Sequence, residues 1–117
     1  MKNFDQQELD KFSKLAKDWW NPSGKFKPLH LINPLRFDYI KSKIDLKSKK
    51  VLDIGCGGGI LSESLARAGS DVKAIDLADG PLSVAEIRRR ETKLNISYEK
   101  CSTSELVDRG EKYDVIT

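Results

Sequence analysis

A cluster of four glycines within five residues constrains this chain more than any other feature. Residues 51–54 are apolar except for Asp53, as in a buried strand, and the glycine-rich residues 55–59, here called the glycine turn, follow directly. Residues 60–66 then place apolar side chains at helical spacing. Glycine adopts positive φ in a sharp turn, and without a Cβ it lets a ligand lie against bare backbone. The segment therefore predicts the strand, turn and helix that open a nucleotide-binding α/β domain.

The spacing of the glycines separates two classes of ligand. The dinucleotide fingerprint is Gly-x-Gly-x-x-Gly, and Ile60 occupies the position of its third glycine here. Asp53 lies two residues before Gly55, where a carboxylate suits a ligand with an ammonium and a sulfonium better than a pyrophosphate. This string resembles motif I of class I S-adenosylmethionine-dependent methyltransferases. Two alternatives stay open: an NAD-dependent oxidoreductase fragment, against which Ile60 and Asp53 argue, and a turn that binds nothing.

Strands and helices alternate along the rest of the chain. Apolar periodicity predicts three more strands, at residues 71–77, 96–99 and 113–116. Between them, Gly80 and Pro81 mark the start of a helix. This order predicts a parallel, doubly wound sheet with right-handed crossovers. The predicted fold class is therefore α/β, and the resemblance of the glycine turn to motif I implies a Rossmann-like methyltransferase fold with flanking helices.

Two helices are predicted before the first strand. Residues 5–19 place apolar side chains on one helical stripe. Trp19 and Trp20 end this helix, and we favour packing of the helix end onto the core over a substrate lid as their role. Asn33 as N-cap, with Pro34 at the first helical position, predicts a second helix that ends near residue 43.

The chain divides into two parts at its first predicted strand. Residues 1–50 form an N-terminal helical extension, and residues 51–117 form the N-terminal part of a Rossmann-like domain that binds S-adenosylmethionine. The sequence stops in a predicted strand, with no polar tail after it. This predicts a fragment of a longer protein or a truncated gene product, with about the first four strands of the fold. We expect such a chain to be weak or inactive on its own.

Ligands of open α/β sheets bind beyond the carboxyl ends of the strands. Gly55 and Gly57 lie there after the first strand, and Asp76 ends the second, 21 residues beyond Gly55. A carboxylate in that place accepts hydrogen bonds from both ribose hydroxyls, which are common to NAD and S-adenosylmethionine. His30 is the single histidine, and we expect packing or capping from it rather than catalysis. No catalytic residue is assigned.

Composition excludes several classes of partner and site. A net charge of +3 is too small to indicate a nucleic-acid partner, and no apolar run approaches the roughly 18 residues of a membrane-spanning helix. Cys56 and Cys101 form no CxxC pair, so they indicate neither a metal site nor a disulfide framework. The first residues lack the apolar region of a secretory signal. A reducing cytoplasm is the simplest compartment.

Basic residues gather in two places. Five lysines lie at positions 41, 43, 47, 49 and 50, just before or at the start of the first strand, and three arginines lie at positions 88–90. Each near-surface basic residue contributes about 1 kcal/mol to the binding of anionic lipid, so a membrane surface is one interpretation of the lysines. A solvated face is the interpretation that we favour for both groups.

Three segments outside the glycine turn resemble one family closely. They are Phe-Ser-Lys-Leu-Ala-Lys-Asp-Trp-Trp at residues 12–20, Phe-Lys-Pro-Leu-His at residues 26–30 and Ile-Asn-Pro-Leu-Arg at residues 32–36. Together with the glycine turn, they resemble the ubiquinone biosynthesis O-methyltransferases of proteobacteria and mitochondria. The resemblance covers essentially the whole chain, but only the N-terminal half of a family member.

The resemblance implies a reaction, partners and a set of contacts to the methyl donor. The reaction is transfer of a methyl group from S-adenosylmethionine to a phenolic hydroxyl of a polyprenyl-hydroxyphenol (a catechol) or of demethylubiquinol. The inner membrane surface and other proteins of ubiquinone synthesis are the implied surroundings, and a non-catalytic S-adenosylmethionine-binding remnant is the alternative. A guanidinium at Arg36 can hold the methionine carboxylate in a bidentate pair. The predicted cofactor-binding residues are Arg36, Asp53, Gly55, Gly57 and Asp76.

Overall fold

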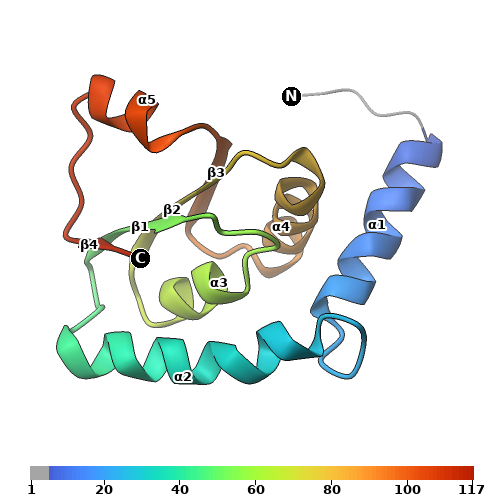
Figure 1. Cartoon of the computed structure of the whole chain (residues 1–117), viewed down its shortest axis with the longest axis horizontal. Coiled ribbons are helices and arrows are strands. Elements are labelled where there is room, and N and C mark those ends of the chain that lie inside the picture. The colour runs from blue at the N-terminus through green and yellow to red at the C-terminus, as the bar shows by residue number, and fades with distance from the viewer. Residues whose placement is uncertain (1–5) are drawn as a thin grey trace.

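The computed structural model describes residues 6–117, which form a parallel four-stranded sheet with helices around it (Figure 1). The strands are β1 (Lys50–Ile54), β2 (Asp71–Asp76), β3 (Ile96–Lys100) and β4 (Val115–Ile116). Their order in the sheet is β3-β2-β1-β4, and every neighbouring pair is parallel. The predicted parallel α/β sheet is therefore confirmed, and β1 leads to the glycine turn from a position between two other strands.

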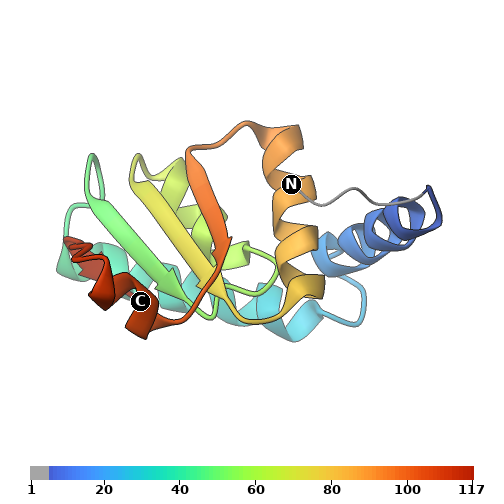
Figure 2. The same cartoon turned by 90° about the horizontal axis from the view of Figure 1, so that it is seen from above.

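Helices cover both faces of the sheet. They are α1 (Gln6–Trp20), α2 (Lys27–Lys43), α3 (Ile60–Arg67), α4 (Asp79–Thr92) and α5 (Thr103–Asp108). α2 and α3 lie on the side of the sheet opposite α5, and α1 lies beside α4 near the β3 edge (Figures 1 and 2). None of the helices within residues 6–117 is long and apolar enough to cross a membrane.

Side chains of β1 enter two separate cores, because successive residues of a strand point to opposite faces of its sheet. Val51 belongs to the larger core, with Leu65 of α3 and Val72 of β2. Leu52 belongs to the smaller core under α5, with Ile75 of β2. The helix that follows the glycine turn is therefore fixed against the sheet by its own buried face.

The second helix begins earlier than the sequence predicts. Asn33 is not its N-cap, because the helix starts at Lys27 and continues through Pro34. Pro28 lies in the first turn, where its missing N–H has no helical acceptor. Pro34 removes one internal hydrogen bond, and beside it the Asn33 side chain donates from Nδ2 to Ser64 Oγ of α3 at 3.0 Å, which connects this part of the helix to α3. Tertiary contacts therefore override the local signal for a helix start.

Other element ends also differ slightly from prediction. α4 begins at Asp79, so Pro81 lies in the first turn of the helix rather than at its predicted first position. β4 contains only Val115–Ile116. The residue before it, Asp114, pairs with Lys50 through its backbone N–H and through Oδ2, both at 2.8 Å.

We expect Leu65→Ala to lower the free energy of unfolding by about 2–5 kcal/mol, because this fully buried side chain would leave a cavity against the sheet. Leu31→Ala on α2 is the matched control, since Leu31 is 64% exposed, and its expected change lies within about 0.5 kcal/mol. Urea denaturation followed by circular dichroism measures both. Equal losses in the two variants would contradict the assignment of the core.

Candidate functional site

Three left-handed residues bend the glycine turn. Gly55, Gly57 and Gly59 have φ angles of +68°, +55° and +90°, a region that other residues rarely adopt. A Cβ at Gly59 would also lie 2.2 Å from the hydroxyl oxygen of Tyr98. The backbone N–H of Gly55 donates to the carbonyl oxygen of Ile75 at 2.9 Å, which ties the turn to β2. The predicted sharp turn is therefore present, at the carboxyl end of β1.

A cavity of about 210 Å³ lies beside the glycine turn. Four of the five predicted site residues line it: Gly55 and Gly57 from the turn, Asp53 from β1 and Arg36 from α2. A carboxylate, a guanidinium and bare backbone therefore border one space. The other lining residues are mostly apolar: Trp19, Leu29, Ile32, Asn33, Cys56, Gly58, Ile60 and Leu61.

Asp76, the fifth predicted residue, borders the turn and is absent from the residues that line the cavity. Its Oδ2 accepts a hydrogen bond from the N–H of Gly57 at 2.9 Å, and its Oδ1 accepts one from the N–H of Ala78 at 2.9 Å. A carboxylate has about four acceptor positions, so both oxygens retain capacity for a ligand. The sequence did not predict that Asp76 also holds the shape of the glycine turn.

Asp53 is a buried carboxylate beneath the turn, with 2% of its surface exposed. Ser62 Oγ donates to its Oδ2 at 2.6 Å, and Thr117 Oγ1 donates to its Oδ1 at 3.1 Å. Burial raises the pKa of Asp53, and the hydrogen bonds from Ser62 and Thr117 and the charge of Arg36 only partly offset this. A cation in the cavity would therefore favour the charged form of Asp53.

Trp19 lies directly on the glycine turn. A Cβ at Gly58 would lie 2.2 Å from Trp19 Nε1, and a Cβ at Gly57 would lie 3.3 Å from Trp19 Cζ2. The indole stacks on Phe26 with ring centroids 4.2 Å apart. Packing, the role favoured for the tryptophans, agrees with this position, but the surface that Trp19 covers is the turn itself. Its place in the cavity wall was not predicted, because no local pattern links residue 19 to residue 58.

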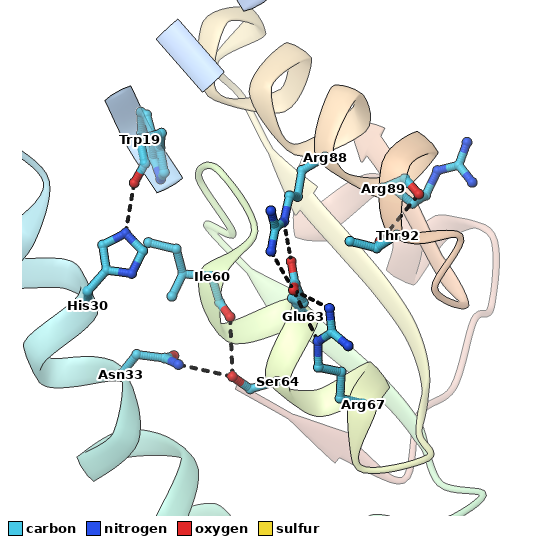
Figure 3. A network of polar contacts seen from close by, with 10 residues as sticks. All are labelled: Trp19, His30, Asn33, Ile60, Glu63, Ser64, Arg67, Arg88, Arg89 and Thr92. Atoms are coloured by element: carbon cyan, nitrogen blue, oxygen red, sulfur yellow. Dashed lines mark hydrogen bonds and ion pairs between the residues drawn. The ribbon is translucent and has the colours of Figure 1, made fainter. Parts of the chain in front are cut away.

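His30 holds the end of α1. Its Nε2 donates to the carbonyl oxygen of Trp19 at 2.8 Å (Figure 3), one of the last carbonyls of the helix, which have no helical donor. Its ring also packs edge-on against Trp20, with ring centroids 5.9 Å apart. The expected packing or capping role of His30 is therefore confirmed, and His30 is not among the residues that line the cavity.

The interpretation of residues 88–90 as a solvated face is wrong for Arg88. Its Nε and Nη2 donate to the carboxylate oxygens of Glu63 at 3.0 and 3.1 Å, and Arg67 Nη2 donates to the same carboxylate at 2.8 Å (Figure 3). Glu63 is only 6% exposed, and a buried carboxylate needs such partners. The guanidinium of Arg88 also lies over the ring of Trp20, 4.2 Å from its centroid.

A family model described as "Methyltransferase domain" matches residues 51–117, which contain the glycine turn and the whole sheet except Lys50, the first residue of β1. The chain belongs to this family of methyltransferase domains. The glycine turn, Asp53 and Asp76 lie inside the matched region, whereas Arg36 and Trp19 lie in the helical extension before it. The site beside the turn is therefore built from the family domain and from the two helices that precede it.

Curated relatives that this chain is similar to carry a more specific name. The chain is 53% identical, over its whole length, to the "Ubiquinone biosynthesis O-methyltransferase" of Actinobacillus pleuropneumoniae serotype 5b, of which it covers 53%. It is 50% identical, over 98% of its length, to the protein of the same name from Coxiella burnetii, of which it covers 49%. These relatives confirm the family resemblance of the sequence. The chain spans about half the length of the curated relatives it matches.

A solved structure confirms the fold class. Magnesium protoporphyrin IX methyltransferase from Synechocystis PCC 6803, with bound SAH, superposes with a TM-score of 0.71. The alignment covers 97% of this chain and 53% of that chain, at 21% sequence identity. The two N-terminal helices and the sheet therefore recur together in a methyltransferase of distant sequence.

We expect Gly58→Ala to displace Trp19, because the new Cβ would overlap the indole ring. Tryptophan fluorescence should then shift to longer wavelength as the ring becomes hydrated. Gly80→Ala is the matched control, since a Cβ there meets no atom within 4 Å, and its spectrum should equal that of the unsubstituted chain. An unchanged spectrum in Gly58→Ala would contradict the contact between Trp19 and the turn.

We expect the charged carboxylate of Glu63 to make the free energy of unfolding vary with pH in the acid range. Burial raises the pKa of Glu63, but hydrogen bonds from Arg88 and Arg67 outweigh burial and leave the pKa below its usual value. The stabilisation is therefore complete above the unfolded-state pKa and is lost as the pH falls through the lower folded-state pKa. As the pH falls below about 5, unfolding free energy should fall less steeply in Glu63→Gln than in the unsubstituted chain.

Denaturation at a series of pH values measures this dependence. Asp108→Asn on the exposed surface of α5 is the control, and its curve should run parallel to that of the unsubstituted chain. If the curve of Glu63→Gln also ran parallel to that of the unsubstituted chain, the paired arginines would not stabilise the charged carboxylate.

Proposed function

We propose that this chain binds S-adenosylmethionine and forms the donor half of an O-methyltransferase of ubiquinone synthesis. The observation that carries the proposal is the shared cavity of the glycine turn, Asp53 and Arg36. The names of the curated relatives support the reaction and the pathway, and the bound SAH of the Synechocystis enzyme supports the class of cofactor.

The charges around the cavity fit the amino-acid end of this donor. Asp53 can attract the ammonium and the sulfonium, and Arg36 can hold the carboxylate in a bidentate pair. The glycine turn provides backbone without Cβ atoms, against which the rest of the molecule can lie. Asp76 retains acceptor positions for the two ribose hydroxyls at the end of β2.

The donor, when bound, supplies an activated methyl group on its sulfonium sulfur. The contribution of these residues is orientation, because holding two reactants in line for a displacement is worth about 7–11 kcal/mol in favourable systems. A phenol has a pKa of about 10, so removal of its proton by a general base would assist. His30 is bonded to the Trp19 carbonyl instead, and we assign no base among the described residues.

The proposed acceptor is a phenol with an apolar polyprenyl chain. Apolar side chains of α2 support this class of acceptor: Leu29 and Ile32 line the cavity, and Leu31, Leu35 and Tyr39 continue along the helix with 64%, 71% and 66% of their surface exposed. An apolar substrate could follow this helix to the site. A peripheral position at a membrane surface, near such a substrate, belongs to the same proposal.

Calorimetric titration with S-adenosylhomocysteine tests the donor site. We expect saturable binding, and we expect Asp76→Asn to weaken it about 10-fold to 100-fold, because an amide cannot accept hydrogen bonds from both ribose hydroxyls as a carboxylate does. Asp71→Asn changes the net charge equally at the opposite end of the same strand, and it should leave the affinity unchanged. Equal affinities for all three proteins would contradict the assigned site.

Two further experiments distinguish the proposed function from its alternatives, an NAD-dependent oxidoreductase and a non-catalytic S-adenosylmethionine-binding protein. NAD⁺ in the same calorimeter should give no heat if the ligand is S-adenosylmethionine, whereas saturable NAD⁺ binding would favour an oxidoreductase. Mass spectrometry of a polyprenyl catechol incubated with chain and donor detects transfer itself. Methylated product above background would support the proposed reaction and would contradict the expectation that this chain is weak or inactive on its own. Donor binding without product agrees with that expectation and equally with a non-catalytic S-adenosylmethionine-binding protein.

A further inference from the structure

We propose that Trp19 is a donor-binding residue that closes the cavity over the glycine turn, and that Arg88 is the positioning residue that seats it there. This inference rests on the proposed donor site. Trp19 lines the same cavity as Asp53 and Arg36. Its indole covers Gly57 and Gly58, the backbone that a ligand of this turn must approach.

Trp19 forms a wall beside the ligand space. The indole edge with Nε1 and Cζ2 faces the two glycines, one ring face stacks on Phe26, and the cavity remains open next to it. Nε1 is buried and makes no hydrogen bond, so packing against the turn has outweighed the usual preference of an indole N–H for a partner. Loss of this wall would expose one side of the cavity to solvent.

α1 packs along α4, and further contacts at its C-terminal end hold Trp19 in place. Among the side chains described in this helix, Ala16 alone is buried, and most of the others are exposed. The end of the helix is held by the His30 contact to the Trp19 carbonyl and by the guanidinium of Arg88 over the ring of Trp20. Together with the packing of α1 on α4 and the stacking of the indole on Phe26, these contacts hold the indole of Trp19 where it lies.

Arg88 connects this end of α1 to the helix that begins at the glycine turn. The same guanidinium that lies over Trp20 donates two hydrogen bonds to Glu63 of α3. Because α3 follows the turn directly, Arg88 fixes Trp20, and with it Trp19, relative to the turn. Arg67 donates to the same carboxylate (Figure 3), and its only ion pair in the described chain is with Glu63, so it offers an internal comparison.

Fluorescence titration tests the role of Trp19, because the chain has two tryptophans that can be removed one at a time. Trp20→Phe leaves Trp19 as the single emitter, and S-adenosylhomocysteine should change its emission along the calorimetric binding curve. Trp19→Phe leaves Trp20, and its emission should stay constant while the affinity falls about threefold to tenfold. An emission change that follows Trp20 instead, or unchanged affinity in Trp19→Phe, would overturn the assignment.

Calorimetry with two arginine variants tests the role of Arg88. Arg88→Met removes an ion pair to Glu63 and the contact with Trp20, whereas Arg67→Met removes an ion pair to Glu63 alone. We expect Arg88→Met to weaken S-adenosylhomocysteine binding about threefold to tenfold and Arg67→Met to leave it unchanged. Hydrogen exchange at residues 16–20 should be faster in Arg88→Met alone. Equal affinities and exchange rates in the two variants would overturn the role of Arg88.

Further results would show whether the roles of Trp19 and Arg88 are wrong or whether the donor site itself is wrong. Tighter binding by Trp19→Phe or Arg88→Met would show that the indole obstructs the cavity, which contradicts a wall that favours binding. Absence of binding by the unsubstituted chain would contradict the donor site itself, and with it this inference. Normal binding that neither substitution alters would contradict the inference and leave the donor site standing.

Discussion

The hydrogen bond from the Gly57 N–H to Asp76 is the contact on which the site depends. It connects the glycine turn after β1 to the end of β2 at 2.9 Å, and the N–H groups of Gly55 and Cys56 add bonds to the Ile75 carbonyl at 2.9 and 3.0 Å. A turn with three left-handed glycines is costly in conformational entropy. These contacts offset that cost and keep bare backbone at the edge of the cavity.

The two opposite charges at the cavity, the carboxylate of Asp53 and the guanidinium of Arg36, come from different parts of the chain. A ligand that carries both a positive and a negative charge would contact both parts. Asp53 lies almost completely buried, with Ser62 and Thr117 as hydrogen-bond donors. Arg36 reaches the cavity from α2, which belongs to the helical extension. The family domain therefore provides the carboxylate and the turn, while the extension provides the guanidinium and the aromatic wall. Both parts are needed for the complete charge pattern.

Local patterns predicted most of the fold and the centre of the site. The glycine turn and the shared position of Gly55, Gly57 and Asp53 follow from signals within a few residues, and the parallel direction of the strands follows from the alternation of strands and helices along the chain. Long-range contacts could not be read in this way. Pro34 signals a helix start but lies inside α2, because contacts with α3 stabilise the longer helix. The three adjacent arginines likewise gave no sign that Arg88 meets a buried carboxylate from another helix.

A nitrogen-15 correlation spectrum of the 117-residue chain, recorded during titration with S-adenosylhomocysteine, tests the central claim most directly. The account predicts that the largest shifts occur at the amides of Gly55, Gly57 and Asp76 and at the indole N–H of Trp19, and that all four follow one binding curve. Saturable shifts confined to other parts of the chain would place the ligand elsewhere and contradict the assignment of the glycine turn as the donor site.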